Sequence, residues 1–255
     1  MELAWLCGFA FLAGFVDAVV GGGGLIQIPA LFLFLSPAVS SDAVRVLGTN
    51  KLASFCGTSV AMVQYARRVP IAWGTILPAA LSAFLFSALG ALVVSKIHSD
   101  FLRPLVLVLL VAVGAYTVLR PDLGSRHRPV YQGRMAALLG AGVGAVIGFY
   151  DGFFGPGTGS FLIFALVGLF GFDFLAASAG AKVVNVATNV AAILYFANGD
   201  KIAYGYALPM GLCNILGALA GARLAIFKGS RFVRGFFLVV IGAMILRFGW
   251  QVVQR

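Results

Sequence analysis

Hydrophobic residues fill eight long stretches of the chain, and polar residues lie mostly in the short connections between them. The stretches cover residues 3–35, 44–66, 71–95, 101–119, 135–167, 176–197, 202–227 and 232–252. A helix that crosses the hydrocarbon core of a bilayer needs about 20 apolar residues, and these stretches supply them. The pattern therefore predicts an all-α, polytopic membrane protein.

The first and fifth stretches are the longest, and closely spaced glycines interrupt both of them. The first break is Gly21–Gly24, and the second is Gly155–Gly159, which includes Pro156 and Thr158. Consecutive glycines destabilise a helix interior. Broken backbone at membrane depth is tolerated only where protein or a watery cavity satisfies its polar groups. We therefore expect two shorter helices in each of these stretches.

The two halves of the sequence match each other at a nearly constant offset. Matched positions include Asp17 with Asp151, Gly21 with Gly155, Lys51 with Lys182, Pro78 with Pro209 and Gly90 with Gly221. The series predicts an internal duplication, with a first transmembrane repeat at 1–120, a basic cytoplasmic linker at 121–134 and a second transmembrane repeat at 135–255.

The relative orientation of the repeats depends on how the broken stretches meet the membrane. If each one crosses once, the chain makes eight crossings and the halves are parallel. If each one enters and returns, every half has a re-entrant helix pair plus three spanning helices, and the halves are inverted. The segment Leu25–Leu35 is too short to span alone, which favours inversion.

Composition supports a membrane protein and excludes several other classes. Hydrophobic residues make up 61% of the chain and charged residues 10%, whereas soluble domains carry about 25% charged residues. The net charge of +10 comes from Lys and Arg in the connections rather than from a basic stripe, so nucleic acid is not an expected partner. The three cysteines and two histidines lack metal-ligand spacing, and we expect no metal and no cofactor.

Paired interruptions at matching positions of two halves indicate the substrate site of a transporter. Lys51 and Lys182 lie inside apolar stretches, where a charge is costly and usually faces a cavity; the alternative is snorkelling to the interface, which is also the simplest interpretation of Arg223. Amide and hydroxyl side chains share a helical face with each lysine. The substrate-binding residues that we expect are Gly22, Gly23, Gly24, Gln27, Asn50, Lys51, Ser54, Gly157, Thr158, Gly159, Ser160, Lys182, Asn185 and Asn189.

Asp17 and Asp151 are the matched acids just before the two breaks. One interpretation makes them structural braces that pair with lysine or cap a broken helix. The other makes them coupling residues that bind a proton or a cation. The sequence leaves both open.

These motifs resemble those of the TauE/SafE sulfite-exporter family, also called the four-toluene sulfonate uptake permeases. The segments that carry the resemblance are Gly14-Phe-Val-Asp17-Ala-Val-Val-Gly-Gly-Gly-Gly-Leu25, Gly48-Thr-Asn-Lys51, Gly148-Phe-Tyr-Asp-Gly-Phe-Phe-Gly-Pro-Gly-Thr-Gly-Ser160 and Ala181-Lys-Val-Val-Asn-Val-Ala-Thr-Asn189. The resemblance implies a duplicated carrier in the bacterial inner membrane that moves sulfite, sulfonates or related anions. Pro156 and Thr158 replace plain glycines in the second break, so the two half-sites need not bind alike.

The leading hypothesis is a secondary transporter of small sulfur-containing anions that works by alternating access around a midplane site. Its expected partners are the anion, the lipid bilayer and protons as the coupling ion, with a homodimer left open. The alternatives are a passive anion channel and a carrier of an unrelated anion such as a carboxylate. An intramembrane enzyme is disfavoured because no catalytic cluster lies within the apolar stretches.

Overall fold

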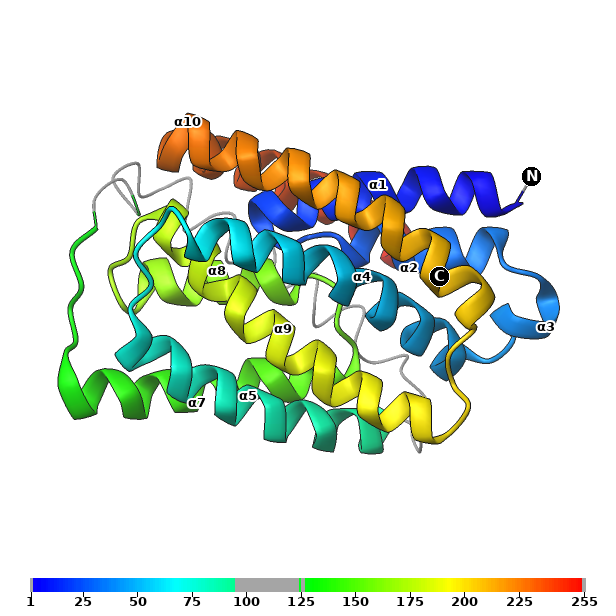
Figure 1. Ribbon diagram of the computed structural model, residues 1–255, viewed down its shortest axis with the longest axis horizontal. Coiled ribbons are helices and arrows are strands. Elements are labelled where there is room, and N and C mark those ends of the chain that lie inside the picture. Colours follow the sequence, from blue (N-terminus) through cyan, green and yellow to red (C-terminus); the bar gives the residue numbers. More distant parts are fainter. Residues whose placement is uncertain (1, 95–123, 125–126, 254–255) are drawn as a thin grey trace.

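The computed structural model describes residues 2–94, 124 and 127–253, and the ordered elements in these ranges are all helices (Figure 1). The helices are α1 (Glu2–Val20), α2 (Gly24–Phe34), α3 (Pro37–Ser40), α4 (Ala43–Ala66), α5 (Trp73–Val94), α7 (Gly133–Phe153), α8 (Thr158–Gly168), α9 (Phe174–Asn198) and α10 (Tyr204–Val253). Five of them, α1, α5, α7, α9 and α10, are long and apolar enough to cross a membrane. The predicted all-α membrane fold is confirmed. The predicted spanning segment 101–119 lies outside the described residues.

Both glycine-broken stretches fold back on themselves as helical hairpins. In the first, the ring of Phe34 at the end of α2 stacks on Trp5 near the start of α1, with centroids 6.3 Å apart. In the second, the backbone N–H of Arg128, just before α7, donates to the carbonyl of Gly171, just after α8, at 2.8 Å. The chain therefore enters and returns at each break. The short helices α2 and α8 have 11 residues each, too few to span a bilayer.

The long helix α10 consists of two arms separated at Gly229, whose φ of 72° only glycine adopts without strain. The first arm, 204–228, packs on α1 and α4, whereas α5 packs on α7 and α9. Glycines on α7 allow its close approach to α5, because a methyl group on Gly144 or Gly148 would overlap the α5 backbone.

Matched helices run in opposite directions, as the colour gradient in Figure 1 shows. From its first residue to its last, α4 runs from right to left and α9 from left to right, while α5 and the first arm of α10 are likewise opposed. Helices α4 and α9 lie at the centre, and each contacts the other half of the chain. An inverted pair of repeats would have this arrangement, although the duplication itself stays a prediction.

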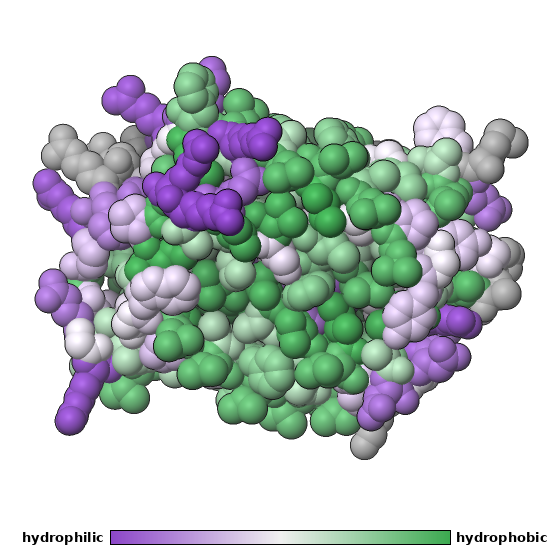
Figure 2. Space-filling model, in the orientation of Figure 1, coloured by the Kyte–Doolittle hydropathy of each residue, from purple (hydrophilic) through white to green (hydrophobic). Residues whose placement is uncertain are grey.

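The surface divides into an apolar middle and two polar ends, which are seen as green and purple regions in Figure 2. Leu85, Leu138 and Leu246 are among the large apolar side chains that are more than 60% exposed, as expected for contact with lipid. The loop after α4, the start of α7 with the residues before it, and the turn at Gly229 gather at the left in Figure 1 and carry more than half of the basic residues that the structure describes. Positive charge marks the cytoplasmic side. Arg126 of the predicted cytoplasmic linker lies outside the described residues.

Candidate functional site

The two glycine breaks meet each other in the interior of the protein. A methyl group built on Gly21 would overlap the backbone of Gly159, and φ at Gly21 is 79°, so both geometry and space require glycine here. The hydroxyl of Ser160 donates to the carbonyl of Val20 at 2.8 Å and thereby satisfies the end of α1. The end of α1 and the start of α8 thus form one junction at the centre of the molecule.

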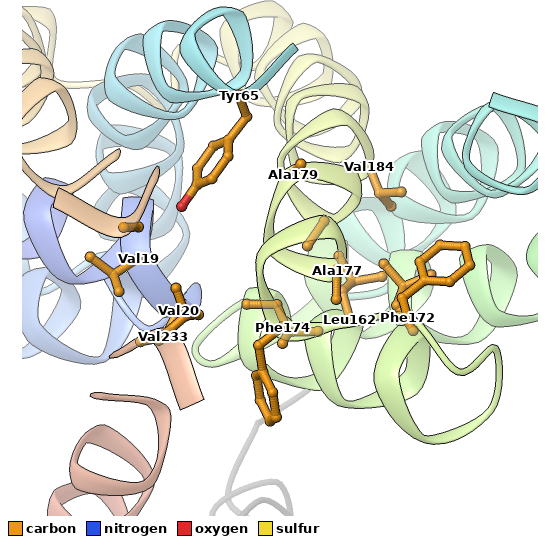
Figure 3. Close-up of a cluster of buried hydrophobic side chains, with 14 of the residues drawn as sticks. Val19, Val20, Tyr65, Leu162, Phe172, Phe174, Ala177, Ala179, Val184 and Val233 are labelled. Carbon is orange, nitrogen blue, oxygen red and sulfur yellow. The ribbon is translucent and has the colours of Figure 1, made fainter. Parts of the chain in front are cut away.

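Hydrophobic side chains enclose this junction on the side toward the basic end. Figure 3 shows Tyr65 of α4 directed toward Val19 and Val20 at the end of α1, with Phe174 and Ala177 of α9 nearby. The Tyr65 hydroxyl donates to the carbonyl of Ala18 at 3.0 Å. The last carbonyls of α1 are therefore bonded by side chains from other helices, as a buried broken helix requires.

A small cavity of about 30 Å³ lies beside the junction. Its lining comes from both halves of the chain and consists of Asp17, Gly21, Gly24, Asn50, Lys51, Ser54, Thr58, Asp151, Gly155, Gly157, Thr158, Gly159, Asn185 and Asn189. A space of this size holds about one water molecule. We call this conformation, in which the polar site has room for about one water molecule, the closed conformation.

The starts of the two short helices point at this cavity. Gly24 begins α2 and Thr158 begins α8, and the preceding residues, Gly23 and Gly157, make no side-chain cap hydrogen bond. The N-terminus of a helix carries the positive end of its dipole and favours anions. The breaks therefore bring two weakly positive helix ends to the same small space.

Lys51 and Asp151 form the first of two buried ion pairs at the site. The Lys51 Nζ lies 2.6 Å from the Asp151 Oδ2, and both side chains are 6% exposed. The pair joins α4 to α7, and both residues line the cavity. This ion pair is in direct contact with the space where a ligand would sit.

Lys182 and Asp17 form the second ion pair, which has a different environment. The Lys182 Nζ lies 3.0 Å from the Asp17 Oδ2 and also donates to the backbone carbonyl of Asp17. The Thr58 hydroxyl donates to the same carboxylate oxygen at 3.1 Å. The Lys182 side chain is completely buried and is not part of the cavity lining. This second pair therefore holds the end of α1 in place.

The two ion pairs cross between the halves, because each lysine pairs with the aspartate of the other half. Two ammonium groups and two carboxylates leave the site with no net charge. Buried charges of this kind need partners, and breaking a pair leaves an uncompensated charge. The crossing thus neutralises the closed site and ties the two halves together.

Several residues that were expected to bind substrate lie outside the cavity lining, namely Gly22, Gly23, Gln27, Ser160 and Lys182. The Gln27 side chain faces α10, where its Oε1 accepts a hydrogen bond from the Asn214 Nδ2 at 3.0 Å. Thr158 lines the cavity, but its hydroxyl donates to the carbonyl of Gly155 at 2.7 Å. The hydroxyls of Ser160 and Thr158 therefore both bond backbone carbonyls at the breaks. A binding role for any of these residues stays a prediction.

Sequence reasoning passed over some residues that the structure brings to the site. Thr58 is not one of them: it lies on the helical face of Lys51 and Ser54, as its spacing predicts, and it lines the cavity. The Tyr150 hydroxyl donates to the carbonyl of Pro156 at 2.6 Å and supports the second break. A single tyrosine or asparagine within an apolar stretch gives no such signal, so Tyr150 and Asn214 were not identified.

Comparison with known proteins identifies relatives along nearly the whole chain. The family model described as sulfite exporter TauE/SafE matches residues 6–248. The chain is 37% identical to the probable membrane transporter protein YfcA of Escherichia coli (strain K12), over 92% of this chain and 85% of that protein. It is 37% identical to the probable membrane transporter protein ORF9 of Sinorhizobium sp, over 96% and 91% of the two chains. A probable membrane transporter protein of Haemophilus influenzae is 36% identical over 97% and 96%. No solved structure matches the chain significantly.

Proposed function

This chain belongs to the sulfite exporter TauE/SafE family, and we propose that it is a secondary transporter of a small sulfur-containing anion, such as sulfite or an organosulfonate. It is a multi-pass membrane protein, and the names of its family and relatives point to a membrane transporter rather than an enzyme. The observation that carries the proposal is the meeting of two glycine breaks at a closed polar cavity lined by both halves.

The chemistry of the cavity favours a small anion. Lys51 supplies the one ammonium group among the described lining residues, and the starts of α2 and α8 add positive dipole ends. The side chains of Asn50, Asn185 and Asn189 line the same space and offer amide donors. A tetrahedral or trigonal oxyanion has several acceptor oxygens and would satisfy these donors together.

Binding of an anion to Lys51 would compete with Asp151. The closed site is neutral, and an extra negative charge in a buried cavity is costly unless another charge is removed. If the anion replaces the Asp151 carboxylate on Lys51, that carboxylate loses its partner and takes up a proton. Asp17 is bonded by both Lys182 and Thr58 in this conformation, and we expect it to keep both partners during transport. We therefore assign proton coupling to Asp151 and a structural role to Asp17.

Transport requires the cavity to widen, because about 30 Å³ cannot hold a sulfonate. We propose that the closed conformation lies between an inward-open and an outward-open state, which are reached by rocking of two inverted repeats. The end of α1 and the start of α8 contact each other through the backbone of Gly21 and Gly159, and we expect the two halves to move against each other at this junction. In the bacterial inner membrane, the basic end of the protein would face the cytoplasm.

Anion flux into proteoliposomes tests this function. The purified protein is offered sulfite, thiosulfate, sulfate, taurine and sulfoacetate, with and without a pH gradient. The proposal predicts saturable, gradient-sensitive flux that is lost in Lys51→Met. Lys201→Met is the matched control, because Lys201 is 43% exposed in the connection between α9 and α10.

Other outcomes would favour the alternatives. Flux that does not saturate and is unchanged by Asp151→Asn would indicate a passive anion channel. Saturable flux of a carboxylate such as lactate, with none of the sulfur anions, would indicate a carrier of another substrate class. Equal flux in Lys51→Met and wild type would show that Lys51 does not bind the transported anion.

A further inference from the structure

A second and much larger pocket of about 460 Å³ lies between α4 and the first arm of α10, away from the central cavity. Its polar lining consists of Arg67, Arg68 and Arg223 together with Ser59 and Gln64. Arg67 and Arg68 follow the last residue of α4, and Arg223 is close to the end of the first arm of α10. The pocket thus lies at the basic end of the protein, at the depth of a membrane interface.

The positive charges in this pocket have no counterions among the residues that the structure describes. Within the described part of the chain, Arg67, Arg68 and Arg223 form no ion pair, and all three are exposed. Gln64 Nε2 and Ser59 Oγ are buried atoms without a hydrogen-bond partner among the described residues. Three guanidinium groups around one space repel each other unless an anion lies between them. The pocket therefore presents charge and donors that an anionic group would satisfy.

The rest of the pocket is apolar, which distinguishes it from a site for a soluble anion. Val60, Val63 and Leu219 complete the lining. Val63 is 41% exposed, and Leu216, one turn before Leu219 on α10, is 59% exposed. This apolar surface continues from the arginines toward the middle of the membrane. Figure 2 shows hydrophilic side chains over the left ends of α4 and α10, directly beside hydrophobic surface.

We propose that this pocket binds an anionic phospholipid of the cytoplasmic leaflet. The lipid phosphate would lie among Arg67, Arg68 and Arg223, and an acyl chain would lie along Val63 and Leu219. Basic pockets between transmembrane helices on the cytoplasmic side suit anionic headgroups, and guanidinium groups match phosphate oxygens in pairs. Because α4 carries Lys51 and α10 belongs to the other half, a bound lipid would connect the two halves at this end.

Native mass spectrometry of the full-length protein tests the proposal without any assumption about the transported anion. The protein is released from micelles that contain equal amounts of phosphatidylglycerol and phosphatidylethanolamine with matched acyl chains. We expect wild type to retain phosphatidylglycerol preferentially. The triple variant Arg67→Gln, Arg68→Gln, Arg223→Gln should lose roughly a hundredfold in relative affinity, because each basic residue near an anionic headgroup contributes about fivefold.

Two further variants decide between a specific pocket and general surface charge. The control Arg128→Gln, Arg134→Gln, Arg231→Gln removes the same charge from the same end, outside the pocket, and should retain the lipid. Val63→Trp fills the pocket, keeps all three arginines and should expel the lipid. Size-exclusion chromatography checks that each variant is folded.

Three results would overturn the proposal. The first is an equal loss of phosphatidylglycerol binding in the triple variant of the pocket arginines and in the triple variant of the control arginines. The second is that the wild-type protein shows no preference for phosphatidylglycerol. The third combines two observations: thiosulfate or inorganic phosphate displaces phosphatidylglycerol, and the triple variant of the pocket arginines has a raised KM for anion flux. Together they would identify the pocket as an entry vestibule for soluble anions. None of these depends on whether Lys51 binds the transported anion.

Discussion

The two buried ion pairs look alike in sequence but differ in what surrounds them. Lys51 and Asp151 both line the cavity, and each is bonded to the other at 2.6 Å. Lys182 is completely buried outside the lining and bonds both the carboxylate and the backbone of Asp17. Matched residues in two halves have thus come to different environments, and the difference predicts different functions.

The comparison shows how a site of matched parts can bind a ligand without losing its structure. If both pairs opened for the substrate, the ends of α1 and α7 would lose their partners together. With Lys182 and Thr58 holding Asp17, the end of α1 stays fixed while the other pair exchanges its partner.

The largest effect is expected from Lys51→Met. Removing one partner of a desolvated charge contact costs about 2–5 kcal/mol in binding, so anion flux should fall at least about thirtyfold. Asp151 borders the cavity rather than the apolar core, so the protein should remain folded. Flux assays with yields normalised by size-exclusion chromatography measure this. If Lys51→Met retains the flux of the wild-type protein, the Lys51–Asp151 pair does not bind the anion, and the proposed difference in function between the two ion pairs is wrong.

Asp17→Asn should mainly affect stability. It leaves the completely buried Lys182 ammonium without a counterion, which costs about 3–5 kcal/mol of unfolding free energy. Adding Lys182→Met should restore most of the loss, because the site is then neutral. Thermal or denaturant midpoints in detergent report both changes.

Asp151→Asn is the matched variant for this experiment. Its loss of stability should be smaller, because Lys51 borders the cavity, where water can reach its ammonium group. An equal loss in Asp17→Asn and Asp151→Asn would contradict the assignment of different roles to the two pairs.

The glycines of the first break should differ from one another. At Gly21, φ is 79° and an added methyl group would overlap Gly159, so Gly21→Ala should cost about 2–4 kcal/mol of stability. At Gly24 the nearest atom to an added Cβ is the Pro156 Cα at 3.5 Å, an ordinary contact, so Gly24→Ala should be close to neutral in stability. Equal midpoints for the two variants would show that the meeting of the breaks is not required.

The smallest effect is expected at Asp42, which caps α4 far from the cavity. Burial opposes its ionisation, but hydrogen bonds from Lys201 and from the backbone N–H groups of Arg45 and Val44 outweigh it and lower the pKa of Asp42. A lowered folded-state pKa stabilises the protein above the normal carboxyl pKa, and this contribution is lost as the pH falls through the folded-state pKa. Asp42→Ala should cost about 1 kcal/mol at neutral pH.

A pH series of unfolding midpoints for wild type and Asp42→Ala measures this contribution. The difference between the two proteins should shrink as the pH falls below the normal range for an aspartate. A difference that stays constant down to acid pH would assign the effect to packing rather than to the ionised cap.

The sequence alone was sufficient for much of the fold. The apolar stretches and the glycine breaks predict the helices, and the shortness of Leu25–Leu35 predicts that the chain returns after the first break, as it does. These features are local, because helix length and glycine geometry depend on neighbouring residues. The third spanning segment of the first half, 101–119, lies outside the described residues.

The partners at the site depend instead on which helices pack together. No local pattern shows that Lys51 pairs with Asp151, because the two residues are 100 positions apart and meet only because α4 and α7 both pack against α9. Gln27 follows a glycine break and could equally face the cavity or a neighbouring helix; it faces Asn214 on α10. Sequence reasoning therefore identified the polar residues more readily than their partners.

The most direct test counts the protons that are taken up when the anion binds. Isothermal titration calorimetry in two buffers of different ionisation enthalpy gives this number. The ligand is a sulfur anion that shows saturable flux; if thiosulfate is among these anions it is used, because it stays ionised. We predict about one proton per anion for wild type and for the Asp17→Asn, Lys182→Met double variant, and none for Asp151→Asn. Proton uptake that persists in Asp151→Asn but disappears in the double variant would reverse the roles of the two ion pairs and contradict this account.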